Sequence, residues 1–219
     1  MSIQNSPIPN FPLSESQFTE LNKITDELRI AYQFLNEIEG PKVTFYGGVN
    51  LEEDSEDYKM IFELAKEFSH RGWNVLSGGG PGAMTASLEG AKAGKNGKSV
   101  GFRIAIKNEP PEFKPDIGFT FESFITRKYS LRQSDVMIYC PGSVGTLDEL
   151  MENLDLLKTH KMDSRKIFLY NSKFWKGLDK FIKETIIRDW QLGEESIGRL
   201  YKVVDTKKEI IESVFGKGK

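Results

Sequence analysis

The sequence predicts an α/β protein with a Rossmann-like, doubly wound and mainly parallel sheet, covered by helices on both faces. Three observations predict this fold. Short apolar segments alternate with longer stretches of helical periodicity, which is typical of βαβ units. Val136–Cys140 is apolar at every position, as expected for a strand that is buried on both faces. Glycine-rich turns follow several strands, at the sheet edge where ligands bind in such folds.

The individual elements follow from periodicity and from breaker residues. Apolar residues recur every three or four positions over residues 14–38, which predicts an N-terminal helical extension, whereas residues 1–13 carry three prolines and are expected to form a loose arm. The expected strands are 42–46, 73–76, 99–102, 117–121, 136–140, 166–170 and 200–204. The expected helices are 55–70, one that ends at Gly94, 123–133, 146–159, 173–189 and 206–215. Residues 103–116 form a long loop, and such loops are often functional.

Length and composition limit the class of protein. A chain of 219 residues suits one domain, so residues 1–219 are expected to form a single Rossmann-like nucleotide-binding domain. A net charge of −2 and a pI near 5.9 argue against a nucleic-acid partner, because phosphate-backbone binding needs a strongly basic surface. The sequence shows no apolar run of about 20 residues and no signal peptide, so no membrane partner is expected. One cysteine suits a cytoplasmic protein.

The first glycine loop, Ser77–Gly82, lies between a strand and a helix. Glycine lets the backbone approach a ligand closely, although the same residues could simply make a tight turn. Pro81 is expected in the first turn of the following helix. The loop lacks the Lys-Ser/Thr ending of a phosphate-binding P-loop. The next strand ends in Phe102-Arg103 and not in an acidic residue, so a dinucleotide cofactor is not favoured.

The second glycine loop, Cys140–Gly145, connects a buried strand to a helix that carries Glu149 near its start. Backbone N–H groups at a helix start favour an anion such as a phosphate, and Thr146 could donate its hydroxyl to the same group. Thr146-Leu147-Asp148-Glu149 also matches a capping box, in which Thr146 and Glu149 only start the helix. The residues by themselves leave both interpretations open.

Three motifs together resemble the LOG ("Lonely Guy") family and related bacterial nucleotide phosphoribohydrolases. They are Ser77–Gly82, Phe124–Lys128 and Pro141–Glu149, in the order in which that family has them. The resemblance covers residues 41–190. It implies a Rossmann-like fold, a homodimer or larger homo-oligomer, and hydrolysis of a nucleoside 5′-monophosphate to free base and ribose 5-phosphate. The substrate would be a cytokinin riboside monophosphate or a nucleotide like AMP. Members have also been labelled lysine decarboxylases, but these residues do not indicate a pyridoxal phosphate site.

The resemblance also implies roles for individual residues. Cleavage of an N-glycosidic bond passes through an oxocarbenium-like ribosyl centre, which Glu149 would stabilise. Arg127 would pair with the substrate and assist the departure of the base, and Lys128 would support the anionic end or the neighbouring carboxylate. The remaining substrate-binding candidates are Gly79, Gly80, Gly82, Gly142, Ser143, Val144, Gly145 and Thr146. No metal is expected, because the sequence offers no His/Cys cluster, and no cofactor is expected.

Two positions depart from the family's pattern. Ser143 stands where the family has the second glycine of Pro-Gly-Gly, and Gly47-Gly48-Val49-Asn50 lacks the hydroxyl and the following cation that relatives often carry after the first strand. A second hypothesis is therefore a non-catalytic nucleotide- or cofactor-binding carrier on the same fold. A third is an oligomeric scaffold that has lost the pocket.

Overall fold

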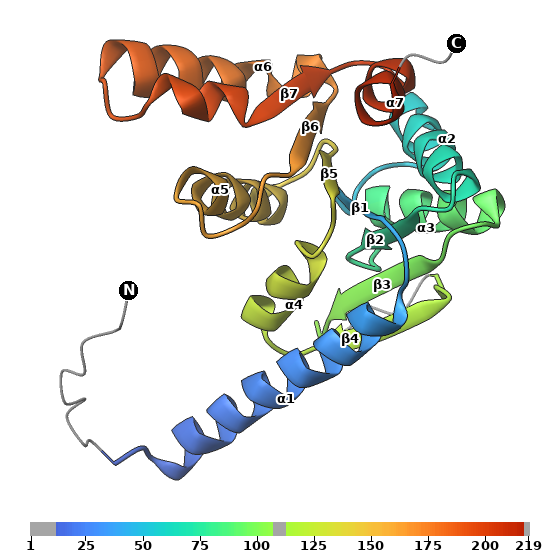
Figure 1. The fold of residues 1–219 in the computed structure, drawn as a ribbon, viewed down its shortest axis with the longest axis vertical. Helices are drawn as coiled ribbons and strands as arrows, with labels where there is room; N and C mark the ends of the chain where they lie inside the picture. The colour runs from blue at the N-terminus through green and yellow to red at the C-terminus, as the bar shows by residue number, and fades with distance from the viewer. Residues whose placement is uncertain (1–11, 107–112, 217–219) are drawn as a thin grey trace.

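The computed structural model describes residues 12–106 and 113–216 (Figure 1). The arm expected over residues 1–13 therefore lies almost entirely outside the described residues, as does the middle of the long loop. Seven strands of the described chain form one sheet in the order β4-β3-β2-β1-β5-β6-β7, and all of its pairings are parallel. The strands are β1 (Lys42–Tyr46), β2 (Asn74–Ser77), β3 (Ser99–Ile104), β4 (Ile117–Phe121), β5 (Val136–Tyr139), β6 (Lys166–Tyr170) and β7 (Tyr201–Val204).

The helices divide between the two faces of this sheet (Figure 1). α2, α3 and α7 cover one face, and α1, α4, α5 and α6 cover the other. Their bounds are α1 (Glu15–Glu37), α2 (Glu56–His70), α3 (Ala83–Gly94), α4 (Phe124–Leu131), α5 (Val144–Lys158), α6 (Ser172–Lys180) and α7 (Lys207–Phe215). The predicted doubly wound α/β fold is thus confirmed. No helix of the described chain is long and apolar enough to cross a membrane.

The strands alternate their side chains between two hydrophobic cores. In β5 and the residue after it, Val136, Ile138 and Cys140 pack toward α2 and α3, whereas Met137 and Tyr139 pack toward α4 and α5. All five side chains are buried. An alternation of period two with apolar residues on both sides is what a parallel strand between two helical layers requires.

The chain reverses its direction of winding between β1 and β5. β1 is followed by α2 on one face of the sheet, whereas β5 is followed by α5 on the other. The two strands nevertheless lie side by side, with Phe45 paired to Ile138 and Tyr46 to Tyr139. The loops that follow such neighbours separate to opposite faces and leave a crevice at the carboxyl edge. The fold therefore places a crevice between the loops after β1 and β5, at the position where ligands bind in such folds.

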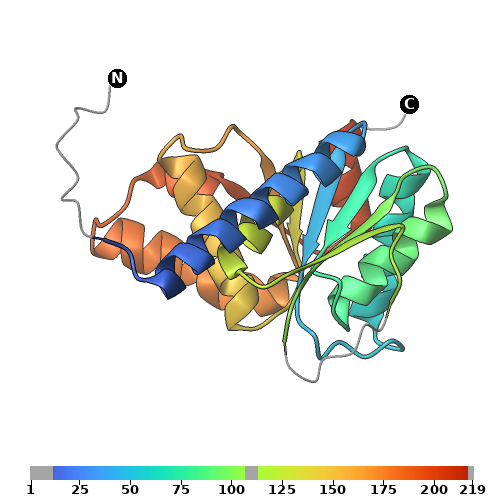
Figure 2. The ribbon, with the colours of Figure 1, turned by 90° about the horizontal axis from the view of Figure 1, so that it is seen from below.

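The N-terminal helix is a covering element and not a free appendage. α1 begins with a capping box formed by Ser14 and Gln17 and lies along α4, as Figures 1 and 2 both show. Ala31 and Leu35 are buried in the core, and the rings of Tyr32 and Tyr129 meet edge to face with centroids 5.6 Å apart. The helix predicted over residues 14–38 is confirmed.

The helix expected over residues 173–189 changes type halfway. After α6 the chain continues as a π-helix over Phe181–Asp189, and it ends where the Trp190 N–H donates to the Thr185 carbonyl at 3.0 Å, a spacing of five residues. The apolar pattern of the sequence marks which face is buried, but it does not distinguish four-residue from five-residue hydrogen bonding. The position of this segment was predicted correctly and its helix type was not.

Candidate active site

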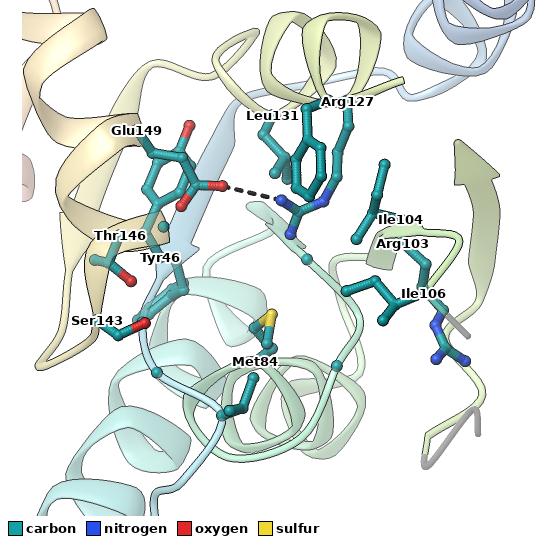
Figure 3. A pocket seen from close by; sticks show the side chains of 18 residues that line it. Tyr46, Met84, Arg103, Ile104, Ile106, Arg127, Leu131, Ser143, Thr146 and Glu149 are labelled. Carbon is teal, nitrogen blue, oxygen red and sulfur yellow. Dashed lines mark hydrogen bonds and ion pairs between the residues drawn. The ribbon is translucent and has the colours of Figure 1, made fainter. Parts of the chain in front are cut away.

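A pocket occupies the crevice beside the winding switch (Figure 3). Its walls come from the ends of β1 and β3, from the loops after β2 and β5, and from α4 and α5. The predicted residues that line it are Gly80, Arg127, Ser143, Gly145, Thr146 and Glu149. Three segments that are far apart in the sequence thus meet at one edge of the sheet.

Arg127 and Glu149 form an ion pair inside this pocket. Arg127 Nη1 lies 3.1 Å from Glu149 Oε1, and only 12% and 11% of the two side chains are exposed. The Arg127 Nε–H donates to the Phe102 carbonyl at 2.9 Å, so two acceptors fix the plane of the guanidinium. Figure 3 shows the two side chains reaching toward each other from α4 and α5. A buried charge pair held in this way is costly to break.

Gly78 makes room for this guanidinium. A Cβ atom at Gly78 would lie 2.2 Å from Arg127 Nη2 and 2.5 Å from the sulfur of Met84, closer than atoms can approach. The first glycine of the loop therefore leaves space for the Arg127 guanidinium in the orientation that Phe102 and Glu149 fix. The sequence placed Gly78 in a glycine loop, but only the packing of α4 against β3 reveals this role.

Burial dominates the electrostatics of Glu149. It raises the pKa of the carboxyl to about 7, although the neighbouring Arg127 guanidinium acts in the opposite direction. Asp148 adds to the increase, and Lys128 opposes it weakly. A carboxyl with a pKa near 7 changes charge at physiological pH, which is typical of functional sites.

Two stacked tyrosines support the base of α5. The rings of Tyr46 and Tyr139 lie parallel with centroids 4.5 Å apart. The Asn153 side-chain amide donates to the Tyr139 hydroxyl at 2.7 Å, and that hydroxyl donates to the Glu149 carbonyl at 3.3 Å. Burial raises the pKa of both tyrosines well above its ordinary value, so both remain neutral beside the carboxylate.

The start of α5 corrects the capping-box interpretation. Ser143 is the N-cap residue and the Leu147 N–H donates to its carbonyl at 3.1 Å, so Thr146 lies inside the first turn. Thr146 therefore cannot cap the helix for Glu149. The Ser/Thr-x-x-Glu spacing alone could not reveal this, because it does not specify where the preceding turn ends and the helix begins.

The same turn explains how Ser143 replaces a glycine. Ser143 has φ −99° and ψ −159°, an extended conformation that any residue adopts. Gly142 is the residue that the turn requires, because a Cβ there would lie 2.2 Å from Thr146 Oγ1. Without that Cβ, the loop lies directly beside the Thr146 side chain. The departure at Ser143 thus leaves the helix start intact.

Five predicted substrate-binding residues do not line this pocket. Lys128 turns away from it and binds Asp148 and Glu152 at 3.0 and 2.9 Å; burial alone would lower the pKa of Lys128, but these hydrogen bonds raise it. The other four are Gly79, Gly82, Gly142 and Val144. Gly142 and Val144 flank a lining residue in the chain.

The loop before α3 also differs from its prediction. Gly82 is the N-cap of α3 and has φ +66°, so Pro81 precedes the cap and does not lie in the first turn. Gly79 borders a neighbouring cavity beside Arg103. Only Gly78 and Gly80 of this loop line the pocket itself.

The sequence reasoning missed the apolar side of the pocket. Met84, Ile104, Ile106, Phe124 and Leu131 line it together with the glycines after β1. Several of these residues end a strand or begin a helix, and strand ends at the carboxyl edge are where pocket residues are expected. This position, and for Ile104 and Ile106 also the long loop expected over residues 103–116, were the signals in the sequence that could have identified them.

The described residues that line the pocket include no anchor for pyridoxal phosphate, the cofactor that the label lysine decarboxylase implies. Such enzymes bind this cofactor through a lysine Schiff base. Among the described residues that line the pocket there is no lysine, and the nearest candidate in the sequence motif, Lys128, is engaged by Asp148 and Glu152. Within residues 12–106 and 113–216, no cluster of His, Cys, Asp and Glu side chains could hold a metal ion.

Comparison with known proteins gives curated relatives in sequence and solved structures of similar fold. The pyrimidine/purine nucleotide 5′-monophosphate nucleosidase of Escherichia coli K12 is 27% identical over 189 residues, which cover 77% of this chain and 38% of the relative. The chain thus spans about two fifths of the length of the curated relatives that it matches. A molybdenum cofactor binding protein from Rippkaea orientalis superposes with a TM-score of 0.60 at 20% identity, over 80% of this chain and 96% of that one. The molybdenum cofactor carrier protein of Chlamydomonas reinhardtii gives 0.57 at 20% identity, with the same coverage.

The fold and the pocket define a Rossmann-like α/β protein with a buried Arg–Glu pair at its winding switch. The two molybdenum cofactor proteins share this fold. The family model described as "Possible lysine decarboxylase" matches residues 84–214, more than half of the chain. The chain therefore belongs to this family, which is the LOG family that its three sequence motifs resemble.

Proposed function

We propose that the protein hydrolyses the N-glycosidic bond of a nucleoside 5′-monophosphate to free base and ribose 5-phosphate. The observation that carries the proposal is the buried Arg127–Glu149 pair beside a helix N-terminus in one pocket. The nucleosidase named among the relatives supports the same reaction class.

The start of α5 supplies a site for the 5′-phosphate. The first N–H groups of a helix have no intrahelical acceptor, and the helix dipole adds partial positive charge there. Ser143, Gly145 and Thr146 line the pocket at this point, so two hydroxyls and free backbone N–H groups face the same space. A phosphate fits this donor set without any metal ion.

Glu149 stands one helical turn beyond that phosphate site and faces the pocket. As the bond between the ribose and the base breaks, its electron pair leaves with the base and positive charge develops at the anomeric carbon. The ionised Glu149 carboxylate stabilises this charge and orients the water that adds to the carbon. The water proton reaches the base, which leaves neutral.

Arg127 completes the arrangement from the other side. Its guanidinium is fixed by Phe102 and Glu149 and stabilises negative charge on the departing base, while Met84 and Phe124 provide apolar contacts for the ring. Electrostatic groups that are fixed before the reaction contribute most to the rate, because no reorganisation is needed.

The test is to incubate the protein with a panel of purine and pyrimidine nucleoside 5′-monophosphates and to measure released base. We expect release from at least one of them, and a loss of about 10³-fold in Glu149→Gln. Asp148→Asn is the matched control, because it makes the same chemical change on the adjacent, exposed side chain. No release by the wild-type protein would contradict the proposal.

The carrier hypothesis predicts a different result in the same experiment. A non-catalytic protein would bind a nucleotide or cofactor without releasing base, and Glu149→Gln would then change affinity alone. Homo-oligomerisation, cytoplasmic localisation and the absence of nucleic-acid and membrane partners stay predictions. The exposed apolar side chains Phe124, Ile125 and Val144, at the starts of α4 and α5, support an oligomer.

A further inference from the structure

The N-terminal helix buries a carboxylate against the helix that carries Arg127. Glu27 lies on the same face of α1 as Ala31 and Leu35 and is only 6% exposed. A buried carboxylate is unfavourable unless hydrogen bonds satisfy it. Its place on an apolar helix face therefore indicates a specific set of donors.

Those donors all belong to the start of α4. Glu27 Oε1 accepts from the Glu122 N–H at 2.6 Å, and Oε2 accepts from the Ser123 N–H at 3.3 Å and from the Thr126 hydroxyl at 2.5 Å. Ser123 is the N-cap of α4. Glu27 thus satisfies backbone N–H groups at a helix N-terminus from a distant part of the chain, where a negative charge is also favoured by the helix dipole.

This cap is directly linked to Arg127. Thr126 precedes Arg127 in the chain, and the Arg127 N–H donates to the Ser123 carbonyl at 3.2 Å in the same turn. Thr126 faces α1 and is fully buried, whereas Arg127 faces the pocket. The turn that Glu27 holds on one side therefore presents the guanidinium on the other.

We propose that Glu27 is a positioning residue, which holds the first turn of α4 so that Arg127 is aimed at Glu149. Two flanking contacts between α1 and the α4 region support the same arrangement, the Lys23–Glu122 ion pair and the hydrogen bond between the Tyr32 and Tyr129 hydroxyls. Glu27 precedes the region that the family model matches. On this proposal, the N-terminal helix helps to shape the pocket by holding the turn that carries Arg127.

Glutamate suits this position better than glutamine because of its acceptors. Both backbone partners can only donate, and the carboxylate offers two acceptor oxygens. The amide group of a glutamine would direct N–H donors at one of these partners and leave that buried group unsatisfied. Glu27→Gln therefore keeps the size of the side chain almost unchanged and removes part of the cap.

The experiment compares Glu27→Gln with Asp26→Asn, the same change on the adjacent and exposed residue of α1. The activity readout rests on the proposed function and measures base release from the nucleotide that the wild-type protein cleaves best. We expect Glu27→Gln to lower kcat by about 10- to 100-fold, because small displacements of a catalytic group are costly, and Asp26→Asn to leave it unchanged. In an Arg127→Met background, Glu27→Gln should add little further loss.

A second readout does not need activity. Carbon-13 NMR of the glutamate carboxyls, with Glu149 assigned through Glu149→Gln, follows the titration of Glu149 directly. The charged groups that act on it are Arg127, Lys128 and Asp148, and Arg127 is the cation that α1 positions. Glu27→Gln should shift the Glu149 pKa upward, because a displaced Arg127 favours the carboxylate less, and Asp26→Asn should not.

Thr126→Val removes the hydroxyl donor of the cap and keeps the two backbone N–H donors. It is the alternative test if Glu27→Gln does not fold. It should shift the Glu149 titration in the same direction by a smaller amount. Folded variants with unchanged kcat and unchanged Glu149 titration would overturn the positioning role. If the wild-type protein cleaves no nucleotide, the proposed function fails by itself, and the titration alone decides the role of Glu27.

Discussion

Two groups of ion pairs join α4 to α5, and they differ in what surrounds them. Arg127–Glu149 lies in the pocket with both side chains almost fully buried. On the outer side, Lys128 and Arg132 bind Glu152, and Lys128 also binds Asp148, whose side chain is 56% exposed. The two groups share the same helices and consist of sequence neighbours.

The difference shows how a helix places adjacent residues of one motif in a buried pocket and on a partly exposed outer side. Successive residues of a helix are about 100° apart around its axis, so Arg127 faces the pocket while Lys128 faces α5 from outside. The inner pair fixes two charges where solvent is excluded, and electrostatic interactions are strong there. The outer pairs stay partly hydrated and mainly hold the two helices in register. The Arg-Lys pair of the sequence motif is thus two residues with separate tasks.

Among the substitutions that compare the two groups of ion pairs, the one with the largest expected effect replaces Arg127. Arg127→Met should lower kcat/KM for the cleaved nucleotide by about 100-fold, because it removes a fixed charge beside the leaving group. Lys128→Met removes a cation of similar size from the adjacent position, and it should change kcat/KM by less than about threefold. Equal losses in the two variants would show that Lys128 also serves the substrate.

The pH dependence of the reaction should report the inner pair. Burial raises the pKa of Glu149 to about 7, and the proposed reaction requires the ionised form to stabilise its cationic transition state. The ionised fraction grows as pH rises through 7, so kcat/KM should fall about tenfold per pH unit below about 6 and level off above about 8.

Substitutions sharpen this profile because the two cations act on Glu149 to different extents. Arg127 lowers the Glu149 pKa more than Lys128 does. Arg127→Met should therefore move the acidic limb to higher pH, and Lys128→Met should move it less. If kcat/KM of the wild-type protein instead falls only near pH 4 to 5, then Glu149 is hydrated or the pH dependence reports a different group.

Local patterns were sufficient to predict the fold. Periods of two and of three to four residues located the strands and helices, and buried strands such as β5 identified the parallel sheet. The ends of the elements depend on hydrogen bonds that the pattern does not encode. Ser143 and not Thr146 caps α5, Gly82 and not Pro81 lies at the start of α3, and the segment after α6 is a π-helix.

The candidate site was predictable to the extent that it follows sequence motifs. The motifs identified Arg127 and Glu149, and the structure brings these two residues together in an ion pair. Gly78 and Glu27 were not identified, because each acts on a partner that is distant in the chain. The sequence does show Glu27 as a charged residue four positions before Ala31 on an apolar helix face. The donors that bind it, however, follow only from the packing of α1 on α4.

The smallest expected effect belongs to the outer pairs. Glu152→Gln weakens the contacts of both Lys128 and Arg132, and we expect it to lower the free energy of unfolding by about 1 kcal/mol, because the Glu152 side chain is 33% exposed and such pairs contribute little. Lys128 keeps Asp148, and the Arg132 guanidinium keeps its position over the Tyr129 ring, 5.4 Å from the centroid. Urea denaturation measures the loss, and kcat/KM should stay within about twofold because the inner pair is untouched. A large loss of activity with unchanged stability would mean that the outer pairs transmit their geometry to Glu149, and the two groups would then act as one network.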